Sequence, residues 1–370
     1  MDIQHLHDVW NIKSEYIFHD EFTGYEDLYP EFDKHTKASY DKDPTGTIDA
    51  VQDLYRSRGI VPIVYYTHRG LVNAIKEFKR TRYNTVSENV LGLGNNRGQT
   101  INRFLFPNMM TAEPKGRGSN SLRDRFLDDA KLRRAIRICF EFRDGDRLVY
   151  PTALRRSLEL VTGENIQNFK PQNARAIVEH LCPVMWGRVY DYSAGYGGRL
   201  LGITSSNMRY QYIGVDPNTE TVERLEYMNS LLDNPGTIVQ SVSEDYEPED
   251  IDCAFSSPPY FNLEKYSDEE TQCMVRYTTL DQWFDGYAEP TIRRIHNGLN
   301  GGGLFATNIA DYKTPKEEFA VCERWIALAE KVGFKYQGMI KMLLNTRPGV
   351  GNDKLAGREK YEGVYVFKKV

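Results

Sequence analysis

The chain has 370 residues, of which 40% are hydrophobic and 27% charged, and its formal net charge is −5. This length allows one large α/β domain and a smaller second region. No apolar run approaches the roughly 18 residues of a membrane span and no charged-then-apolar leader is present, and the five cysteines form no CxxC pair. We therefore expect a cytoplasmic protein with reduced thiols, no membrane contact and no metal site.

The charge is unevenly distributed along the chain. Residues 1–65 carry 6 Lys/Arg and 13 Asp/Glu, residues 66–160 carry 19 and 10, and residues 161–370 carry 22 and 29, so the net charges are −7, +9 and −7. A basic block within an acidic chain is typical of a surface that faces phosphates, although a solvated helix face gives the same pattern. We expect the block at 66–160 to contact nucleic acid.

The first 160 residues are predicted to form an N-terminal accessory region. Helical spacing of apolar residues is present at 47–58, 70–80, 121–142 and 152–160, and the apolar run at 61–66 predicts a short buried strand.

Two loops rich in glycine and asparagine, at 92–108 and 113–126, also carry basic residues. Mobile backbone with amide and guanidinium donors suits a groove or a phosphate, and solvated connecting loops are the alternative. The residues expected to contact nucleic acid from these loops are Arg97, Arg103, Lys115, Arg117 and Arg123.

From about residue 165 onward, strands alternate with helices, which indicates a parallel sheet. The last two predicted strands read as an antiparallel closing pair. The expected strands are at 189–190, 210–216, 302–311, 334–344 and 361–369, with a strand and turn at 237–245 and a short apolar strand at Ala254 and Phe255. The expected helices are at 218–232, 279–299 and 316–332.

A glycine-rich turn, DYSAGYGGR at 191–199, follows the first of these strands. Gly195 and Gly197 allow the chain to turn sharply close to a ligand. Asp216 ends the next strand, 25 positions after Asp191, where a carboxylate can accept hydrogen bonds from ribose hydroxyls. Because the GxxxxGK[ST] loop and the full GxGxxG form are missing, a nucleoside with a small charged tail is favoured over ATP or a nicotinamide cofactor.

The stretch DCAFSSPPYFNLEKY at 252–266 is a short strand followed by two prolines and two aromatic residues. Prolines fix φ and donate no N–H, so nearby carbonyls are free to accept, and Tyr260 and Phe261 can present flat faces to a planar ligand. These features suit a site that holds an amino group on a ring. A proline turn that caps a strand is the alternative.

These two stretches resemble motifs of the S-adenosylmethionine-dependent methyltransferases that modify amino groups of DNA bases. DYSAGYGGR resembles their methionine-pocket motif, and SSPPYF resembles their catalytic [D/N/S]-P-P-[Y/F/W] motif, with Ser257, Pro258, Pro259 and Tyr260 in the four places. The resemblance implies S-adenosylmethionine as cofactor. It also implies that 161–370 forms a Rossmann-like class I methyltransferase sheet, mostly parallel with an antiparallel closing hairpin. The residues that it implies for cofactor binding are Phe169, Pro171, Asp191, Ala194, Gly195, Gly197, Asp216, Ser243 and Glu244.

The resemblance assigns a role to each part of the catalytic motif. The Ser257 side chain and the Pro258 carbonyl would accept the two hydrogens of an exocyclic amino group and leave its lone pair in line with the methyl. Tyr260, with Phe261 as a second candidate, would stack on a base that has been flipped out of its helix.

Serine at the first place of the motif is most similar to the cytosine amino-methyltransferases. The implied function is therefore DNA methylation at the amino group of cytosine, as in restriction-modification. Adenine in DNA or a base in RNA is the alternative, and a non-catalytic nucleic-acid-binding module is a third. Only 40 positions separate Asp216 from Ser256, which is too short for an inserted recognition region. We expect recognition from the basic block and from the loop at 347–358, which begins with Arg347; the oligomeric state stays open.

Overall fold

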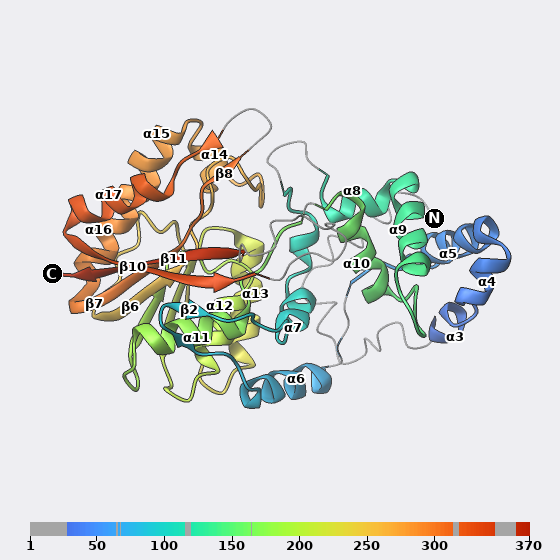
Figure 1. Cartoon of the computed structure of the whole chain (residues 1–370), viewed down its shortest axis with the longest axis horizontal. Helices are drawn as coiled ribbons and strands as arrows, with labels where there is room; N and C mark the ends of the chain where they lie inside the picture. Colours follow the sequence, from blue (N-terminus) through green and yellow to red (C-terminus); the bar gives the residue numbers. More distant parts are fainter. Residues whose placement is uncertain are drawn as a thin grey trace. The chain divides into compact units, whose positions relative to one another are not determined.

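The computed structural model describes residues 28–63, 66, 68–114, 120–163, 165–313, 318–344 and 360–370. The chain divides into two compact units, Met1–Asn73 with Arg103–Gln167 and Ala74–Asn102 with Asn168–Val370 (Figure 1). The segment 74–102, which precedes the predicted domain boundary at residue 160, therefore belongs to the second unit. Helices α6 (His68–Arg80) and α7 (Gln99–Leu105) each cross from one unit to the other.

The described part of the first unit is helical and has its own apolar core, which includes Tyr55, Phe126, Ile136 and Leu154. Its other helices are α3 (Tyr29–Phe32), α4 (Lys37–Lys42), α5 (Pro44–Arg58), the 3-10 turn η2 (Pro107–Met110), α8 (Leu122–Leu127), α9 (Asp129–Glu141) and α10 (Pro151–Thr162).

Two predictions for the first unit are wrong in detail. The helix expected over 121–142 is divided at Asp128, whose extended backbone ends α8 while its side chain accepts from the Lys131 N–H and caps α9. The strand expected over 61–66 is absent from the described residues 61–63, which are buried but pair with no described strand.

The second unit is built on a nine-stranded sheet with the order β1-β2-β10-β11-β7-β6-β3-β4-β5. A separate two-stranded ribbon consists of β8 (Tyr312–Lys313) and β9 (Glu318–Phe319). The strands of the main sheet are β1 (Val86–Ser87), β2 (Val90–Leu91), β3 (Arg188–Asp191), β4 (Gln211–Asp216), β5 (Thr237–Gln240), β6 (Ile251–Ser256), β7 (Leu299–Asn308), β10 (Phe334–Leu343) and β11 (Tyr361–Lys369).

Strands β7, β6, β3, β4 and β5 run parallel, and β11 pairs antiparallel with β7 on one side and β10 on the other. The predicted Rossmann-like sheet, mostly parallel with an antiparallel closing hairpin, is confirmed. The pairing of β2 with β10 was not expected: β2 lies far upstream in the sequence and extends the sheet at that edge.

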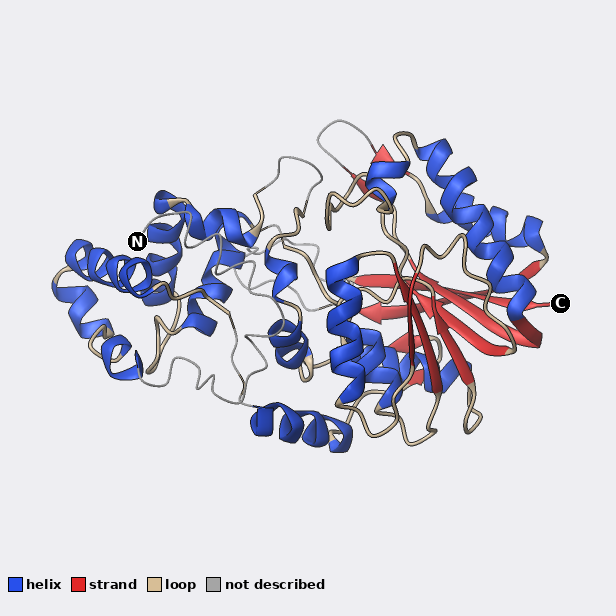
Figure 2. Ribbon diagram, turned by 180° about the vertical axis from the view of Figure 1, so that it is seen from behind, coloured by secondary structure: helices blue, strands red, loops and turns tan. Residues whose placement is uncertain are grey.

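Helices lie on both faces of the sheet (Figure 2). On one face α11 (Pro171–Leu181) packs against α12 (Gly198–Thr204), and on the other α16 (Glu289–Gly298) packs against α17 (Cys322–Val332). The remaining helices are α13 (Thr219–Ser230), α14 (Cys273–Arg276), α15 (Leu280–Trp283) and the π-helical turn η3 (Phe284–Ala288). The helix expected over 316–332 begins at Cys322, because Glu318–Phe319 form β9 instead; residues 316 and 317 lie outside the described residues. The Asp311 carboxylate accepts the N–H groups of Val321 and Cys322 at the start of the helix.

The strand order contains one reversal of direction. From β3 the chain moves outward through β4 to β5, and it then returns to the other side of β3 to form β6 and β7. In open α/β sheets, ligands bind outside the carboxyl ends of the strands at such a reversal. Here the carboxyl ends of β3 and β6 border it, and these are the ends that lead into the glycine turn and into the SSPPYF segment.

Candidate functional site

The glycine turn is held against the neighbouring strand β4 by two backbone donors. Gly195 donates its N–H to Asp216 Oδ2 at 2.8 Å, and Ala194 donates its N–H to the Val215 carbonyl at 2.8 Å. Gly195 and Gly197 have φ values of +55° and +70°, a region that favours glycine. The structure thus brings the predicted residues Ala194, Gly195 and Asp216 together at the carboxyl end of β4.

Asp216 combines burial with a small set of backbone partners. Its side chain accepts from the N–H groups of Gly195 and Asn218, the second at 3.0 Å. Burial raises the pKa of Asp216 to about 6, against the opposing effect of these two donors. Each carboxylate oxygen retains acceptor capacity beyond one N–H, so the group can accept further hydrogen bonds from hydroxyls.

Asp191 lies at the centre of a buried polar network. Arg199 Nε donates to both Asp191 oxygens at 2.9 and 3.0 Å, Tyr212 donates its hydroxyl at 2.7 Å, and Ser256 donates its hydroxyl at 2.6 Å. Burial lowers the pKa of the Arg199 guanidinium, but the nearby Asp191 carboxylate raises it, and the pKa lies above its usual value. These partners lie within the chain, and the contact of Asp191 with a cofactor stays a prediction.

Backbone carbonyls of the segment before β3 approach the glycine turn and α12 closely. A Cβ atom on Gly198 would lie 2.1 Å from the Phe169 carbonyl oxygen, and one on Gly202 would lie 2.0 Å from the Pro171 carbonyl oxygen. The half-buried Phe169 ring packs edge-on against Phe255 at 5.4 Å between centroids. The predicted residues Phe169 and Pro171 therefore lie directly beside the turn.

Two asparagines that were not predicted as site residues hold the glycine turn in place. Asn102 and Asn168 each donate a side-chain N–H to the Tyr196 carbonyl, at 2.7 and 2.9 Å. Asn102 is fully buried and belongs to the segment 74–102, so a residue far upstream of the resemblance shapes the glycine turn.

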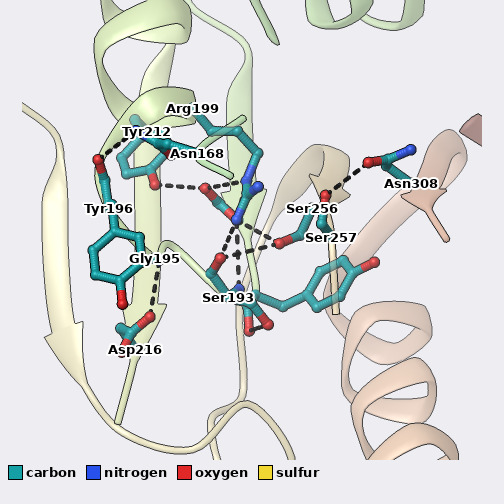
Figure 3. Close-up of polar contacts among 12 residues, drawn as sticks. Asn168, Ser193, Gly195, Tyr196, Arg199, Tyr212, Asp216, Ser256, Ser257 and Asn308 are labelled. Atoms are coloured by element: carbon teal, nitrogen blue, oxygen red, sulfur yellow. Dashed lines mark hydrogen bonds and ion pairs between the residues drawn. The ribbon is translucent and has the colours of Figure 1, made fainter. Parts of the chain in front are cut away.

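The catalytic motif follows β6, the strand beside β3. Ser256 also donates to the Ser193 carbonyl of the glycine turn, at 3.4 Å, which ties the two predicted motifs directly together. The next residue, Ser257, is half-buried and donates its hydroxyl to Asn308 Oδ1 at 3.2 Å (Figure 3). Asn308, at the end of β7, donates its Nδ2 to the Gly363 carbonyl at 3.0 Å, and this contact fixes which side-chain atom faces Ser257.

The two aromatic residues of the motif differ in environment. Phe261 is only 8% exposed and packs against Phe319, with 5.7 Å between centroids. Its ring is part of the core and is not free to stack on a base in this conformation. Tyr260 is less buried and meets Tyr312 edge-on at 5.4 Å, which leaves Tyr260 as the ring available for a ligand. Pro258 is buried and Pro259 is half-buried.

The segment after the motif returns to the glycine turn. The Tyr266 ring packs edge-on against the Tyr196 ring, with 6.1 Å between the ring centroids. The Tyr266 hydroxyl donates a hydrogen bond to the Glu264 carboxylate. Burial raises the pKa of Glu264 to about 7. Burial is also the main cause that raises the pKa of Tyr196 and of Tyr260, and the negative charge of Glu264 raises both pKa values further. Glu264 therefore lies close to both motifs, although neither resemblance nor spacing singled it out.

Ser243 and Glu244, two residues implied for cofactor binding, already have partners within the chain. Ser243 shares a hydrogen bond of 3.1 Å with Thr291. Glu244 accepts from Arg276 at 2.6 Å and from the Tyr277 hydroxyl at 2.8 Å. Burial raises the pKa of Glu244. Both residues follow β5, and their contact with a cofactor stays a prediction.

The predicted basic contacts are scattered. Arg97 is exposed and belongs to the second unit. In the first unit, Arg103 pairs with Glu159 at 3.3 Å, and Arg123 lies 3.8 Å from an Asp124 oxygen. Lys115, Arg117 and Arg347 lie outside the described residues. Contact of any of these side chains with nucleic acid stays a prediction.

Among the described residues, no helix is long and apolar enough to cross a membrane. Within the same ranges no three His, Cys, Asp or Glu side chains are grouped so that they could hold a metal ion.

Sequence reasoning missed the residues that support the site from neighbouring strands. The unpredicted residues that contact predicted site residues are Arg199, Tyr212, Ser256 and Asn308, and the unpredicted Asn102 and Asn168 contact the Tyr196 carbonyl within the glycine turn. Two of these had a usable signal: Arg199 closes the quoted glycine stretch, and Asn308 ends the strand that follows the catalytic strand in the sequence.

No family model and no curated protein matches the sequence. Among solved structures, the chain is similar to TrmN from Thermus thermophilus, at 16% identity and a TM-score of 0.35 over 54% of this chain and 49% of that chain. It is also similar to an S-adenosylmethionine-dependent O-methyltransferase from Thermotoga maritima, at 16% identity and a TM-score of 0.34 over 57% and 70%. A third is a protein from Pyrococcus horikoshii described as a putative RNA methyltransferase, at 13% identity and a TM-score of 0.35 over 54% and 81%. The match spans about half the length of TrmN.

Proposed function

We propose that this protein is an S-adenosylmethionine-dependent methyltransferase that modifies the exocyclic amino group of a nucleic-acid base, with cytosine in DNA as the favoured target. The observation that carries the proposal is the direct link between the two motifs. Ser256, immediately before Ser257, donates to Asp191 and to the Ser193 carbonyl. The glycine turn and the serine-proline segment are thereby held together where the strand order reverses.

The residues of the glycine turn fit a nucleoside cofactor. A Cβ atom on Gly195 would lie 3.8 Å from the Ser193 carbonyl oxygen, an ordinary van der Waals distance, so the turn has room on that side. Asp216 holds a buried carboxylate that only backbone N–H groups satisfy, and ribose hydroxyls would add the donors that favour its ionised form. When bound, the cofactor supplies an electrophilic methyl group on a sulfonium.

The serine-proline segment fits an amino group held for attack. Ser257 uses its own proton in the hydrogen bond to Asn308, so the lone pairs of its oxygen remain free to accept an N–H from the amino group. Together with the Pro258 carbonyl, it would hold both amino hydrogens and direct the nitrogen lone pair at the methyl. Tyr260 would stack on the base. As the nitrogen–carbon bond forms and the sulfur–carbon bond breaks, the nitrogen releases one proton to solvent.

In this proposal, Asp191 and Arg199 position the turn and do not bind the cofactor. Arg199 donates to both Asp191 and the Ser193 carbonyl, which fixes the carbonyl side of the turn. Asn308 is likewise a positioning residue that acts through Ser257.

The test separates binding from transfer. Wild type, Ser257→Ala and Asp216→Ala are incubated with methyl-labelled cofactor and mixed-sequence DNA or RNA, and modified bases are identified by mass spectrometry. Cofactor affinity is measured by calorimetry. We expect Ser257→Ala to lower the transfer rate about 10²-fold with little change in cofactor affinity. Asp216→Ala should weaken cofactor binding about tenfold or more. The exposed Ser230 serves as the control, and Ser230→Ala should change neither quantity.

Each outcome of this test is informative. Labelled cytosine in DNA supports the favoured target, whereas labelled adenine or labelled RNA replaces it by the alternatives. Cofactor binding without transfer to any nucleic acid would indicate a non-catalytic module. Equal effects of Ser257→Ala and Asp216→Ala on binding and transfer would contradict the assigned roles.

A further inference from the structure

The second unit contains a basic groove whose lining includes none of the proposed site residues. Its cavity has a volume of about 690 Å³. The cationic side chains that line it are Lys76, Lys79, Arg80, Arg82 and Arg175. The one carboxylate in the lining is that of Asp233, which already pairs with Lys79 at 3.2 Å. The groove therefore carries a large excess of positive charge.

The fold itself directs these cations to the surface. Leu71, Ile75 and Phe78 are buried and share one face of α6, so Lys76 and Arg80 are exposed on the other face. The Phe78 ring is the nearest neighbour of Gly98, whose Cβ would lie 2.9 Å from it. This contact anchors the end of α6 within the second unit.

One cation of the groove has a structural role. Arg175 is buried, donates to Glu179 at 3.0 Å and to the Lys79 carbonyl at 3.2 Å, and lies over the Tyr83 ring at 4.1 Å. It thereby joins α11 to the end of α6. By contrast, Lys76, Arg80 and Arg82 are exposed and form no ion pair with a described residue.

The helix dipole explains part of this arrangement. Cations in the last turn of a helix are favoured by its C-terminal partial charge, which accounts for Lys79 and Arg80. It does not account for Lys76, one turn earlier, or for Arg82, beyond the helix end. These like charges repel one another when they share a groove, and an anionic ligand would remove the repulsion.

The groove lies at the end of the sheet opposite the proposed reaction site. Its lining residues Asn207 and Asp233 follow α12 and α13 and lead into the amino ends of β4 and β5. Asp191 and Asp216, in contrast, are the last residues of β3 and β4 and lie at the carboxyl ends of these strands. A strand of six residues, such as β4, is about 20 Å long, and one strand of duplex carries a phosphate about every 3.4 Å. A nucleic acid longer than about 6 base pairs would be needed to reach both places.

We propose that this groove binds the phosphate backbone of the nucleic-acid substrate, outside the segment that contains the target base. The inference rests on the proposed function. A small organic ligand would require apolar walls, but the only aromatic ring in the lining is that of Tyr83, which Arg175 covers. Lysine and arginine side chains without such walls suit phosphates and carry no base readout.

The test compares two charge reversals of equal size. The groove variant is Arg80→Glu with Arg82→Glu. The control variant is Lys335→Glu with Lys368→Glu, two exposed residues that face each other on β10 and β11. Binding to random-sequence DNA duplexes of 8 and 30 base pairs is followed by fluorescence anisotropy between 50 and 200 mM salt. Circular dichroism checks that each variant is folded.

We expect the groove variant to bind the 30-base-pair duplex at least about tenfold more weakly than the control variant. The slope of log K against log salt should become shallower by about 2, because each lost phosphate contact removes about 0.9. Because 8 base pairs exceed the roughly 6 needed to reach both places, the groove variant should also bind the 8-base-pair duplex more weakly than the control variant does. Equal affinities and slopes of the two variants on the long duplex would overturn the proposal, as would a wild type that binds neither duplex.

The same preparations separate this proposal from the proposed function. Methyl transfer by wild type, together with a groove variant that binds DNA as the control does, would refute the groove and leave the function intact. A wild type that transfers no methyl, but whose DNA affinity depends on Arg80 and Arg82, would refute the function and support the groove.

Discussion

The buried pair of Asp191 and Arg199 allows the sharpest quantitative prediction. The Asp191 side chain is fully buried and that of Arg199 is 7% exposed, and Arg199 Nε lies 2.9 and 3.0 Å from the two carboxylate oxygens. Arg199→Met removes the guanidinium and leaves the carboxylate with two hydroxyl donors, Tyr212 and Ser256. Breaking a buried pair costs about 3–5 kcal/mol. Because both hydroxyl donors remain, we expect a loss near the lower end, about 3 kcal/mol.

Urea unfolding measures this loss. Trp283 and Trp325 are buried in the core of the second unit, so their fluorescence reports the unfolding of that unit. With a slope of about 2–3 kcal/mol per molar urea, the midpoint of Arg199→Met should fall by about 1 M or more. Arg293→Met is the matched control, because its pair with Glu289 joins two partly exposed side chains on α16 and should be worth about 0–1 kcal/mol.

A double variant strengthens the test. Replacing both members of a buried pair by apolar residues is often close to neutral, so Asp191→Leu combined with Arg199→Met should be more stable than Arg199→Met alone. If Arg199→Met lost less than about 1 kcal/mol, or no more than Arg293→Met, the pair could not be the support of the glycine turn that we describe.

Three further predictions concern the site. The pKa of Asp216 is raised to about 6, and ribose hydroxyls bind to its ionised form, so cofactor affinity should rise as the pH rises through about 6; Asp216→Asn should abolish this dependence in calorimetric titrations. Gly202→Ala places a Cβ 2.0 Å from a carbonyl oxygen of α11 and should lower the free energy of unfolding by about 2 kcal/mol, whereas Gly301→Ala, with open space around it, should leave the urea midpoint unchanged. Asn308→Leu should lower the transfer rate without weakening cofactor binding. Because Asn308 acts through Ser257, adding Asn308→Leu to Ser257→Ala should lower the rate little further. Additive losses of the transfer rate in single-turnover assays would show that Asn308 has an independent role.

The sheet and its two motif-bearing turns could be predicted from sequence because their signals are local. A strand that runs into glycines, or into two prolines, is visible in a few consecutive residues, and the 25-residue offset from Asp191 to Asp216 follows from one strand-helix-strand unit. The order of the strands then brings the turns together.

The support of the site could not be predicted in the same way, because it depends on long-range pairing. Asn102 reaches Tyr196 over 94 positions, and Ser257 reaches Asn308 over 51. No periodicity links such residues. The burial of Phe261 could not be predicted for the same reason, since it depends on Phe319, which lies on a two-stranded ribbon further along the chain.

The pairing of β2 with β10 has a practical consequence for dividing the protein. Residues 90 and 91 cover the side of β10 that faces away from β11, and a fragment consisting of 161–370 would lack them. Its outermost strand would then offer unpaired N–H and C=O groups to any other chain, a common origin of self-association. Such a fragment would also lose the Asn102 side chain that fixes the glycine turn. Aggregation and weak activity of a truncated catalytic domain would therefore reflect the missing strand and asparagine, and a usable fragment would have to retain residues 74–102.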